Sequence, residues 1–254
     1  MAFIKCDFYS EALRKSLSMN VILPDVEPTT KDGKYKTLYL LHGLGDDYTT
    51  WQRRTSIERY LYNKELAVVM LDGGRSFYTD MKKGGKFFTF LTEELPAKVQ
   101  KYFPLSNLRE NNFIAGNSMG GYGSIKAALR CPEKYAACGI LSSVTDIPAK
   151  YNDEILVSWK EEFSYIFGTI EEAIANGNDI FSLVEKLKDS EIKPGIMQIC
   201  GTEDFLYNDN IKLKNALEAC KWPNYTYIEG PGVHSWDFWD ANIEKIIEFV
   251  LNLK

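Results

Sequence analysis

The sequence of 254 residues predicts an α/β protein built around a mostly parallel sheet. Three observations carry this prediction: short apolar runs recur along the chain, most end in glycine or small polar residues, and segments with helical periodicity lie between them. Such runs are typical of strands buried on both faces of a sheet. Alternating strands and helices favour right-handed crossovers and a doubly wound sheet with flanking helices.

The elements follow one another in a regular order. Two β-like stretches open the chain, and later strands are expected at residues 37–41, 67–71, 113–115, 138–141, 196–200 and 225–228; the opening pair covers residues 4–9 and 16–23. Helices are expected at residues 53–62, 87–102, 119–129, 213–220 and 243–251, the last two from one-sided apolar stripes. Because ligands bind at the carboxyl ends of strands in such sheets, the functional residues are expected where strands stop.

Residues 145–191 interrupt this rhythm between two strands of the sheet. The segment is mainly helical in composition and carries exposed-looking aromatic residues, namely Trp159, Phe163, Tyr165 and Phe167. We interpret it as a small cap-like insertion over the strand ends, within a single domain that spans residues 1–254. Trp159 is expected to contact substrate, whereas Phe163 and Phe167 could equally attach the insertion to the sheet.

Composition excludes several classes of function. Hydrophobic residues make up 45% and charged residues 26% of a chain with net charge −5, and no basic cluster predicts a nucleic-acid partner. Charges near the start argue against a secretory signal, and no apolar run could cross a membrane. Five scattered cysteines without a CxxC pair favour free thiols in a reducing compartment, so we expect a cytoplasmic protein.

The strongest motif is the Gly-x-Ser-x-Gly run at residues 116–120, placed between a strand and a helix. In the α/β-hydrolase fold this pattern puts the nucleophile, here Ser118, on a sharp turn, and the flanking glycines let strand and helix cross closely. The turn also exposes the hydroxyl at a helix N-terminus, which favours negative charge. A glycine-rich helix start with an incidental serine is the simpler alternative, and the strand–turn–helix context argues against it.

A serine hydroxyl needs a base, and the chain contains only two histidines, His42 and His234. The α/β-hydrolase order of nucleophile, acid and histidine can be met only by His234, which follows the strand at 225–228. The acid must then lie between Ser118 and His234, after the strand at 196–200. Glu203 and Asp204 both stand there, and chemistry alone does not separate them.

The glycine-rich turn at residues 42–45 follows an early strand, where an oxyanion hole needs a backbone donor. We expect the Leu44 N–H and the N–H of Met119, the residue after the nucleophile, to meet the tetrahedral intermediate. His42 then has a structural role. A plain tight turn is the alternative. With one histidine committed to catalysis, few metal ligands remain, and no metal or other cofactor is expected.

Taken together, these motifs resemble the esterase D group of α/β hydrolases, in particular its bacterial tributyrin-esterase and feruloyl-esterase-like branch. The matching segments cover nearly the whole chain and include the residues 40–43, 116–123 (GNSMGGYG), 203–207 and 234–236. The resemblance implies Ser118, Asp204 and His234 as catalytic residues, no cofactor and frequent homo-oligomerisation. S-formylglutathione hydrolases share the group but typically show GHSMGGHG, so Asn117 and Tyr122 depart from their pattern.

The leading hypothesis is a serine carboxylesterase that acts on a small-molecule ester of a short or compact acid, of acetyl, butyryl or feruloyl type. A thioesterase similar to S-formylglutathione hydrolase is the second candidate, because the same groups would serve a glutathione thioester. A non-catalytic binding protein on the same fold is the third. The presence of every triad residue argues against it.

Overall fold

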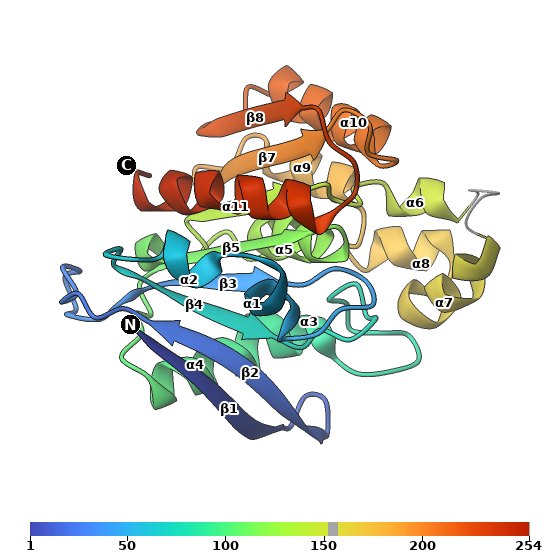
Figure 1. Ribbon diagram of the computed structural model, residues 1–254. Coiled ribbons are helices and arrows are strands. Elements are labelled where there is room, and N and C mark those ends of the chain that lie inside the picture. The colour runs from blue at the N-terminus through green and yellow to red at the C-terminus, as the bar shows by residue number, and fades with distance from the viewer. Residues whose placement is uncertain (152–156, 254) are drawn as a thin grey trace.

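The computed structural model describes the backbone of residues 1–151 and 157–253, and side chains at residues 1–151 and 160–253. In this part of the chain, eight strands form one sheet in the order β1-β2-β4-β3-β5-β6-β7-β8 (Figure 1). The strands are β1 (Ala2–Ser10), β2 (Lys15–Leu23), β3 (Lys36–Leu41), β4 (Leu66–Leu71), β5 (Asn112–Asn117), β6 (Ala137–Leu141), β7 (Gly195–Gly201) and β8 (Tyr225–Gly230). Only the β1–β2 and β2–β4 pairs are antiparallel.

Helices cover both faces of the sheet. They are α1 (Thr50–Arg54), α2 (Ile57–Tyr60), α3 (Phe87–Thr89), α4 (Leu95–Tyr102), α5 (Met119–Arg130), α6 (Ile147–Lys150), α7 (Val157–Phe167), α8 (Ile170–Ala175), α9 (Ile180–Leu187), α10 (Tyr207–Ala219) and α11 (Trp236–Leu251). A π-helical turn, Phe90–Glu94, joins α3 to α4, and a 3₁₀ turn, Arg109–Asn111, precedes β5. The predicted α/β-hydrolase architecture, a mostly parallel sheet flanked by helices, is confirmed.

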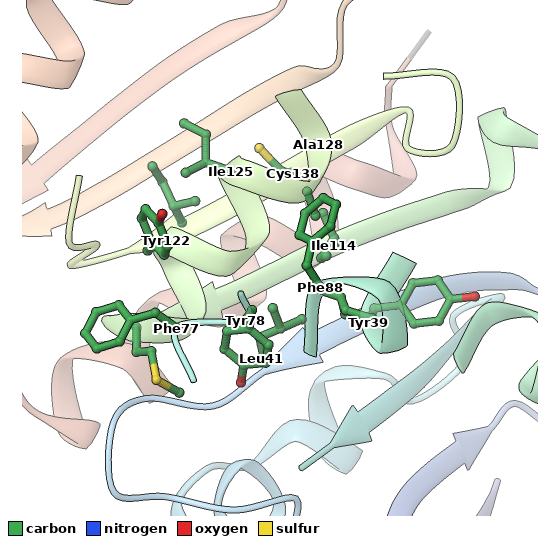
Figure 2. Packing of buried hydrophobic residues seen from close by; sticks show 14 of the residues in the cluster. Tyr39, Leu41, Phe77, Tyr78, Phe88, Ile114, Tyr122, Ile125, Ala128 and Cys138 are labelled. Carbon is green, nitrogen blue, oxygen red and sulfur yellow. The ribbon is translucent and has the colours of Figure 1, made fainter. Parts of the chain in front are cut away.

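Successive side chains of each strand point to opposite faces of the sheet, so the core forms two clusters, one on each face. On β3, Tyr39 and Leu41 belong to the cluster that includes residues of α4, α5, α9 and α10, whereas Leu38 and Leu40 belong to the one that includes residues of α1, α2 and α11. The central strands β3 to β7 are buried along almost their whole length, as the apolar runs predicted. Figure 2 shows part of the first cluster, where Ile114 and Cys138 of the sheet lie near Ile125 of α5.

Two predicted helices differ internally from the structure, and α10 and α11 begin about two turns before the apolar stripes that predicted them. The expected helix at 53–62 is split into α1 and α2, because Thr55 is extended and the Ser56 N–H donates to the Asp240 carboxylate instead (2.8 Å). The expected helix at 87–102 is continuous, but its middle turn is π-helical. The break depends on a hydrogen bond to a residue far away in the chain, which no local sequence pattern encodes.

The segment at residues 145–191 forms helices α6 to α9. Figure 1 shows α6, α7 and α8 beyond the carboxyl ends of the strands, while α9 packs on α5 as a crossover helix. The expectation of exposed aromatics was wrong for Phe163 and Phe167, which are fully buried against Phe77. They attach the segment to the rest of the fold. Tyr165 is exposed, as expected.

Among the described residues, no helix is long and apolar enough to cross a membrane. The five cysteines are all free thiols.

Candidate active site

Ser118 occupies the sharp turn between β5 and α5, with a φ of 53° and a ψ of −117°. A side chain on Gly116 would place its Cβ 2.6 Å from the Leu41 carbonyl oxygen, and one on Gly120 would place it 2.4 Å from the same oxygen. Only glycine therefore lets strand, helix and the end of β3 meet here. The prediction that the motif's glycines permit a close crossing is confirmed by these distances.

The structure brings Ser118, His234 and Asp204 into one line of hydrogen bonds. His234 lies in the loop between β8 and α11, and its Nε2 is 3.0 Å from the Ser118 Oγ. Its Nδ1 is 2.9 Å from Oδ2 and 3.1 Å from Oδ1 of Asp204, which lies in the loop after β7. A proton on Nδ1 that is donated to the carboxylate leaves Nε2 free to accept from the serine hydroxyl.

Asp204 is buried but remains suited to carry charge. Burial opposes ionisation of its carboxyl, yet hydrogen bonds from His234 and the charge of that ring outweigh burial and lower the pKa of Asp204 below its usual range. The Leu206 N–H also donates to Oδ1 at 2.8 Å. An ionised carboxylate at this position holds the imidazole in one tautomer and stabilises its protonated form.

Glu203, the neighbouring carboxylate, points elsewhere. Its Oε2 accepts the Gly232 N–H at 2.6 Å, and its own N–H donates to the Gly232 carbonyl at 3.1 Å. The Gly232 hydrogen bond lowers the pKa of the exposed Glu203 carboxyl. The loop after β7 and the loop after β8 are thus joined directly, and a Cβ on Gly201 would lie 2.1 Å from the Gly232 oxygen. Of the two candidate acids, only Asp204 contacts His234.

Two aromatic rings pack against the His234 imidazole. The Trp239 ring meets it edge to face at 4.9 Å between centroids, and the largely exposed Phe205 ring lies at 4.6 Å. Trp239 is itself fixed by a hydrogen bond from its Nε1 to the Ser142 Oγ (3.1 Å). Neither ring was predicted from the sequence to have a role. The only sequence feature that could have pointed to them is their position, Phe205 directly after Asp204 and Trp239 on the first turn of α11.

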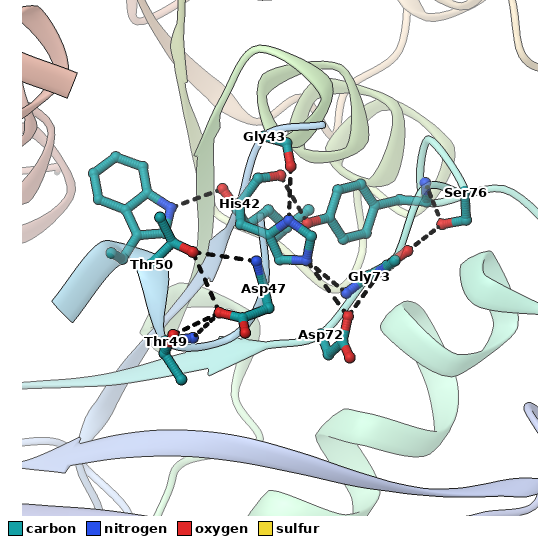
Figure 3. Close-up of polar contacts among 12 residues, drawn as sticks. His42, Gly43, Asp47, Thr49, Thr50, Asp72, Gly73 and Ser76 are labelled. Carbon is teal, nitrogen blue, oxygen red and sulfur yellow. Dashed lines mark hydrogen bonds and ion pairs between the residues drawn. The ribbon is translucent and has the colours of Figure 1, made fainter. Parts of the chain in front are cut away.

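His42 makes a different set of contacts, shown in Figure 3. The Gly73 N–H donates to its Nε2 at 2.9 Å, so the ring proton lies on Nδ1, which donates to the Gly43 carbonyl oxygen at 2.8 Å. The side chain is almost completely buried. The ring therefore joins the turn that carries Leu44 to the loop after β4, where the Asp72 Oδ1 also lies 3.7 Å from Nε2.

The two expected oxyanion donors come from different parts of the chain. Met119 is the first residue of α5, so its N–H is one of those that a helix leaves without an intrahelical acceptor. Leu44 follows Gly43 in the turn after β3 and is partly buried against the first core cluster.

Trp159, the expected substrate contact, belongs to α7, but its side chain lies outside the described residues. Among the residues that the structure does describe, no group of three or more His, Cys, Asp or Glu side chains could hold a metal ion.

Comparisons with known proteins match the whole length of the chain. A family model described as "Putative esterase" matches residues 10–249. An acetyl esterase of Caldicellulosiruptor saccharolyticus is 32% identical, with 98% of each chain covered. The fluorophosphonate-binding serine hydrolase F of Staphylococcus aureus superimposes with a TM-score of 0.88 at 34% identity, covering 99% of this chain and 98% of that one. An S-formylglutathione hydrolase from the same organism gives 0.85 at 35%, with 99% of each covered.

Proposed function

We propose that this chain cleaves esters of short or compact acids with Ser118 as the nucleophile. The chain belongs to the putative esterase family and is a carboxylic ester hydrolase. The observation that carries the proposal is the line of hydrogen bonds from Ser118 through His234 to Asp204, at a strained strand-to-helix turn. A nucleophile, a base and a group that orients the base are what acyl transfer requires.

In the first half-reaction, the Ser118 Oγ attacks the ester carbonyl carbon while His234 Nε2 takes the hydroxyl proton. The carbonyl oxygen becomes an oxyanion, which the N–H groups of Leu44 and Met119 stabilise. When the intermediate collapses, the C–O bond to the alcohol breaks and His234 returns the proton to the departing oxygen. An acyl group remains on Ser118.

In the second half-reaction, His234 deprotonates a water molecule that attacks the acyl carbon. The acid leaves, and the proton returns to Ser118. Asp204 stays ionised throughout and stabilises the imidazolium that forms twice in the cycle. This role agrees with its lowered pKa, which keeps the carboxylate charged at neutral pH.

The preference for short or compact acyl groups is supported by the size of the segment at residues 145–191. Its α9 is used as the crossover helix, and Phe163 and Phe167 are used in packing, so little chain is left to enclose a long acyl tunnel. The acetyl esterase among the relatives points the same way. Acetylated sugars, feruloyl esters and simple glycerides are all compatible substrates.

A series of p-nitrophenyl esters from acetate to decanoate tests this preference. We expect kcat/KM to peak by about butyrate and then fall, because each methylene that the site cannot bury forfeits about 0.8 kcal/mol. A rate that still rises at about eight carbons would reveal a long acyl tunnel and contradict the proposal.

A thioesterase acting on S-formylglutathione is the second candidate, and the 35% identical S-formylglutathione hydrolase favours it. Asn117 and Tyr122 stand where that group typically has histidines, which favours the carboxylesterase. Competition between p-nitrophenyl acetate and S-formylglutathione, compared as kcat/KM, separates the two.

Several further expectations accompany this function. We infer a single domain with residues 145–191 as a small insertion, a cytoplasmic location and association into homo-oligomers. Because backbone N–H groups stabilise the negative charge of the intermediate, activity needs no metal or other cofactor. Activity should therefore survive dialysis against EDTA, and its loss and recovery on adding a divalent metal would contradict the mechanism.

A further inference from the structure

Lys126 is a fully buried lysine on α5, two turns after the nucleophile, and the mechanism above does not use it. Its ammonium has three partners among the described residues. The Nζ donates to the Phe77 carbonyl at 3.1 Å, to the Thr79 Oγ1 at 2.5 Å and to the Asn178 Oδ1 at 3.2 Å. The Tyr122 ring lies 4.5 Å from the same nitrogen. All three ammonium protons therefore have acceptors.

Such a lysine is costly to bury. Loss of solvation is the main reason that the pKa of Lys126 lies well below its usual range; the charge of Arg130 adds to this effect and that of Asp80 opposes it. Buried ion and polar groups often give no more stability than apolar side chains of similar volume. A specific geometric role accounts better for this residue than stability does.

The segment that Lys126 holds has an unusual backbone. Phe77 and Tyr78 both have a φ of 49°, a value that residues other than glycine rarely adopt. The Tyr78 ring fits between two glycines: a Cβ on Gly73 would lie 2.3 Å from it and a Cβ on Gly123 would lie 2.4 Å from it. Figure 2 shows Phe77 and Tyr78 near Tyr122 of α5.

Tyr78 connects this segment to the turn after β3. Its hydroxyl donates to the His42 carbonyl oxygen at 3.0 Å, at the peptide bond that leads into Gly43 and Leu44. The same turn is held by the His42 ring, which links the Gly73 N–H to the Gly43 carbonyl (Figure 3). A continuous set of contacts therefore runs from Lys126 through Phe77 and Tyr78 to the residue before the Gly43–Leu44 peptide.

We propose that Lys126 and Tyr78 are positioning residues that fix the Leu44 N–H where the oxyanion forms. This inference rests on the proposed function, in which Leu44 donates to that oxyanion. Lys126 acts by holding the carbonyl of Phe77, and Tyr78 acts by holding the carbonyl of His42. Neither touches substrate.

The experiment compares Lys126→Met, Tyr78→Phe and the double variant, each checked for folding by circular dichroism. Methionine keeps the length of the side chain without its donors, and phenylalanine keeps the ring without its hydroxyl. Lys134→Met is the matched control, since Lys134 also donates to a backbone carbonyl, that of Thr92 (2.9 Å), but precedes the amino end of β6, whereas the active site lies at the carboxyl ends of the strands. The readouts are kcat and KM for p-nitrophenyl acetate, and the inhibition constant of a trifluoromethyl ketone.

We expect kcat to fall roughly 10- to 100-fold in each single variant, because an oxyanion donor that is slightly misplaced loses most of its effect. KM should stay within about twofold of wild type. The inhibition constant should rise in parallel with the loss of kcat, since the ketone forms an oxyanion on the enzyme. The double variant should be no worse than the poorer single one, and Lys134→Met should match wild type.

Folded single variants with wild-type kcat and inhibition constant would overturn the inference. A double variant whose loss of kcat equals the product of the two single losses would also overturn it, because the two residues would then act independently. If Lys126→Met does not fold, Tyr78→Phe alone decides. An active Ser118→Ala would instead refute the proposed function, so the two failures are distinguishable.

Discussion

The two histidine-bearing loops of this protein use the same side chain in opposite ways. His42, after β3, is buried with both ring nitrogens bonded to backbone groups of Gly43 and Gly73. His234, after β8, is partly open, and its nitrogens contact two side chains, those of Asp204 and Ser118. Backbone partners fix a loop, whereas the Ser118 hydroxyl opposite Nε2 of His234 can give up its proton to the ring.

The hydrogen-bond partners of each histidine, more than its sequence motif, indicate its role. Both histidines lie in glycine-containing turns at the carboxyl ends of strands, so local sequence alone treats them alike. Both rings carry their proton on Nδ1, so the difference lies in the group that faces Nε2: a backbone N–H for His42 and a serine hydroxyl for His234.

The largest expected effect concerns the two histidines themselves. His234→Ala should lower kcat by about 10⁶, the scale seen when the base of a serine triad is lost. His42→Asn should lower it roughly 10- to 100-fold, because it loosens the turn that carries Leu44 without removing the base. Steady-state kinetics on p-nitrophenyl acetate measure both. If His42→Asn proved the more damaging, the assignment of roles would be reversed.

The next largest effect on kcat is expected for the two neighbouring carboxylates, Asp204 and Glu203. Asp204→Asn should lower kcat by about 10⁴, since an amide favours the wrong imidazole tautomer. Glu203→Gln should cost less than about tenfold, because Glu203 bonds Gly232 and leaves His234 untouched. Kinetics of the two variants at pH 7 provide the check, and a dead Glu203→Gln enzyme with an active Asp204→Asn enzyme would exclude Asp204 as the acid.

A smaller effect is expected on stability. The folded-state pKa of Asp204 is lowered, so its ionisation stabilises the fold above the unfolded pKa of about 4, and this contribution is lost as pH falls through the folded value. The melting temperature of wild type should exceed that of Asp204→Asn at pH 7, and the gap should narrow towards pH 3. A gap that widens on acidification would contradict the lowered pKa.

The smallest effect concerns specificity. Trp159→Ala should change the ratio of kcat/KM between acetate and longer or aryl esters by a few fold, and it should leave the melting temperature nearly unchanged. Tyr165→Ala, at an exposed position of the same helix, is the control. An unchanged substrate profile in Trp159→Ala would remove this residue from the substrate site.

Much of the fold followed from the sequence because buried parallel strands leave an unmistakable pattern. Every expected strand is present within two residues of its predicted ends, and the resemblance to the esterase group is confirmed by the family match. The split between α1 and α2 depends on a long-range bond to Asp240, which no local pattern encodes. The burial of Phe163 depends in the same way on Phe77, far away in the chain.

The candidate site was predictable where position along the chain mattered. Chain order singled out His234 over His42, and the structure places it against Ser118 and Asp204. Residue chemistry alone left the two acids open and only the family resemblance implied Asp204; in the structure the adjacent carboxylates bond different partners, and Asp204 is the one that contacts His234. Lys126 and Tyr78 gave no signal, because a lysine in a helix is usually exposed and a tyrosine in a loop has no fixed partner.

Mapping the covalent adduct of a fluorophosphonate tests the central claim most directly. The reagent should label one residue, Ser118, as identified by mass spectrometry of the peptide that contains it. Labelling should disappear in Ser118→Ala and slow strongly in His234→Ala, while His42→Asn should still be labelled. An adduct on another residue, or a Ser118→Ala variant that keeps more than about a tenth of wild-type kcat, would contradict the account.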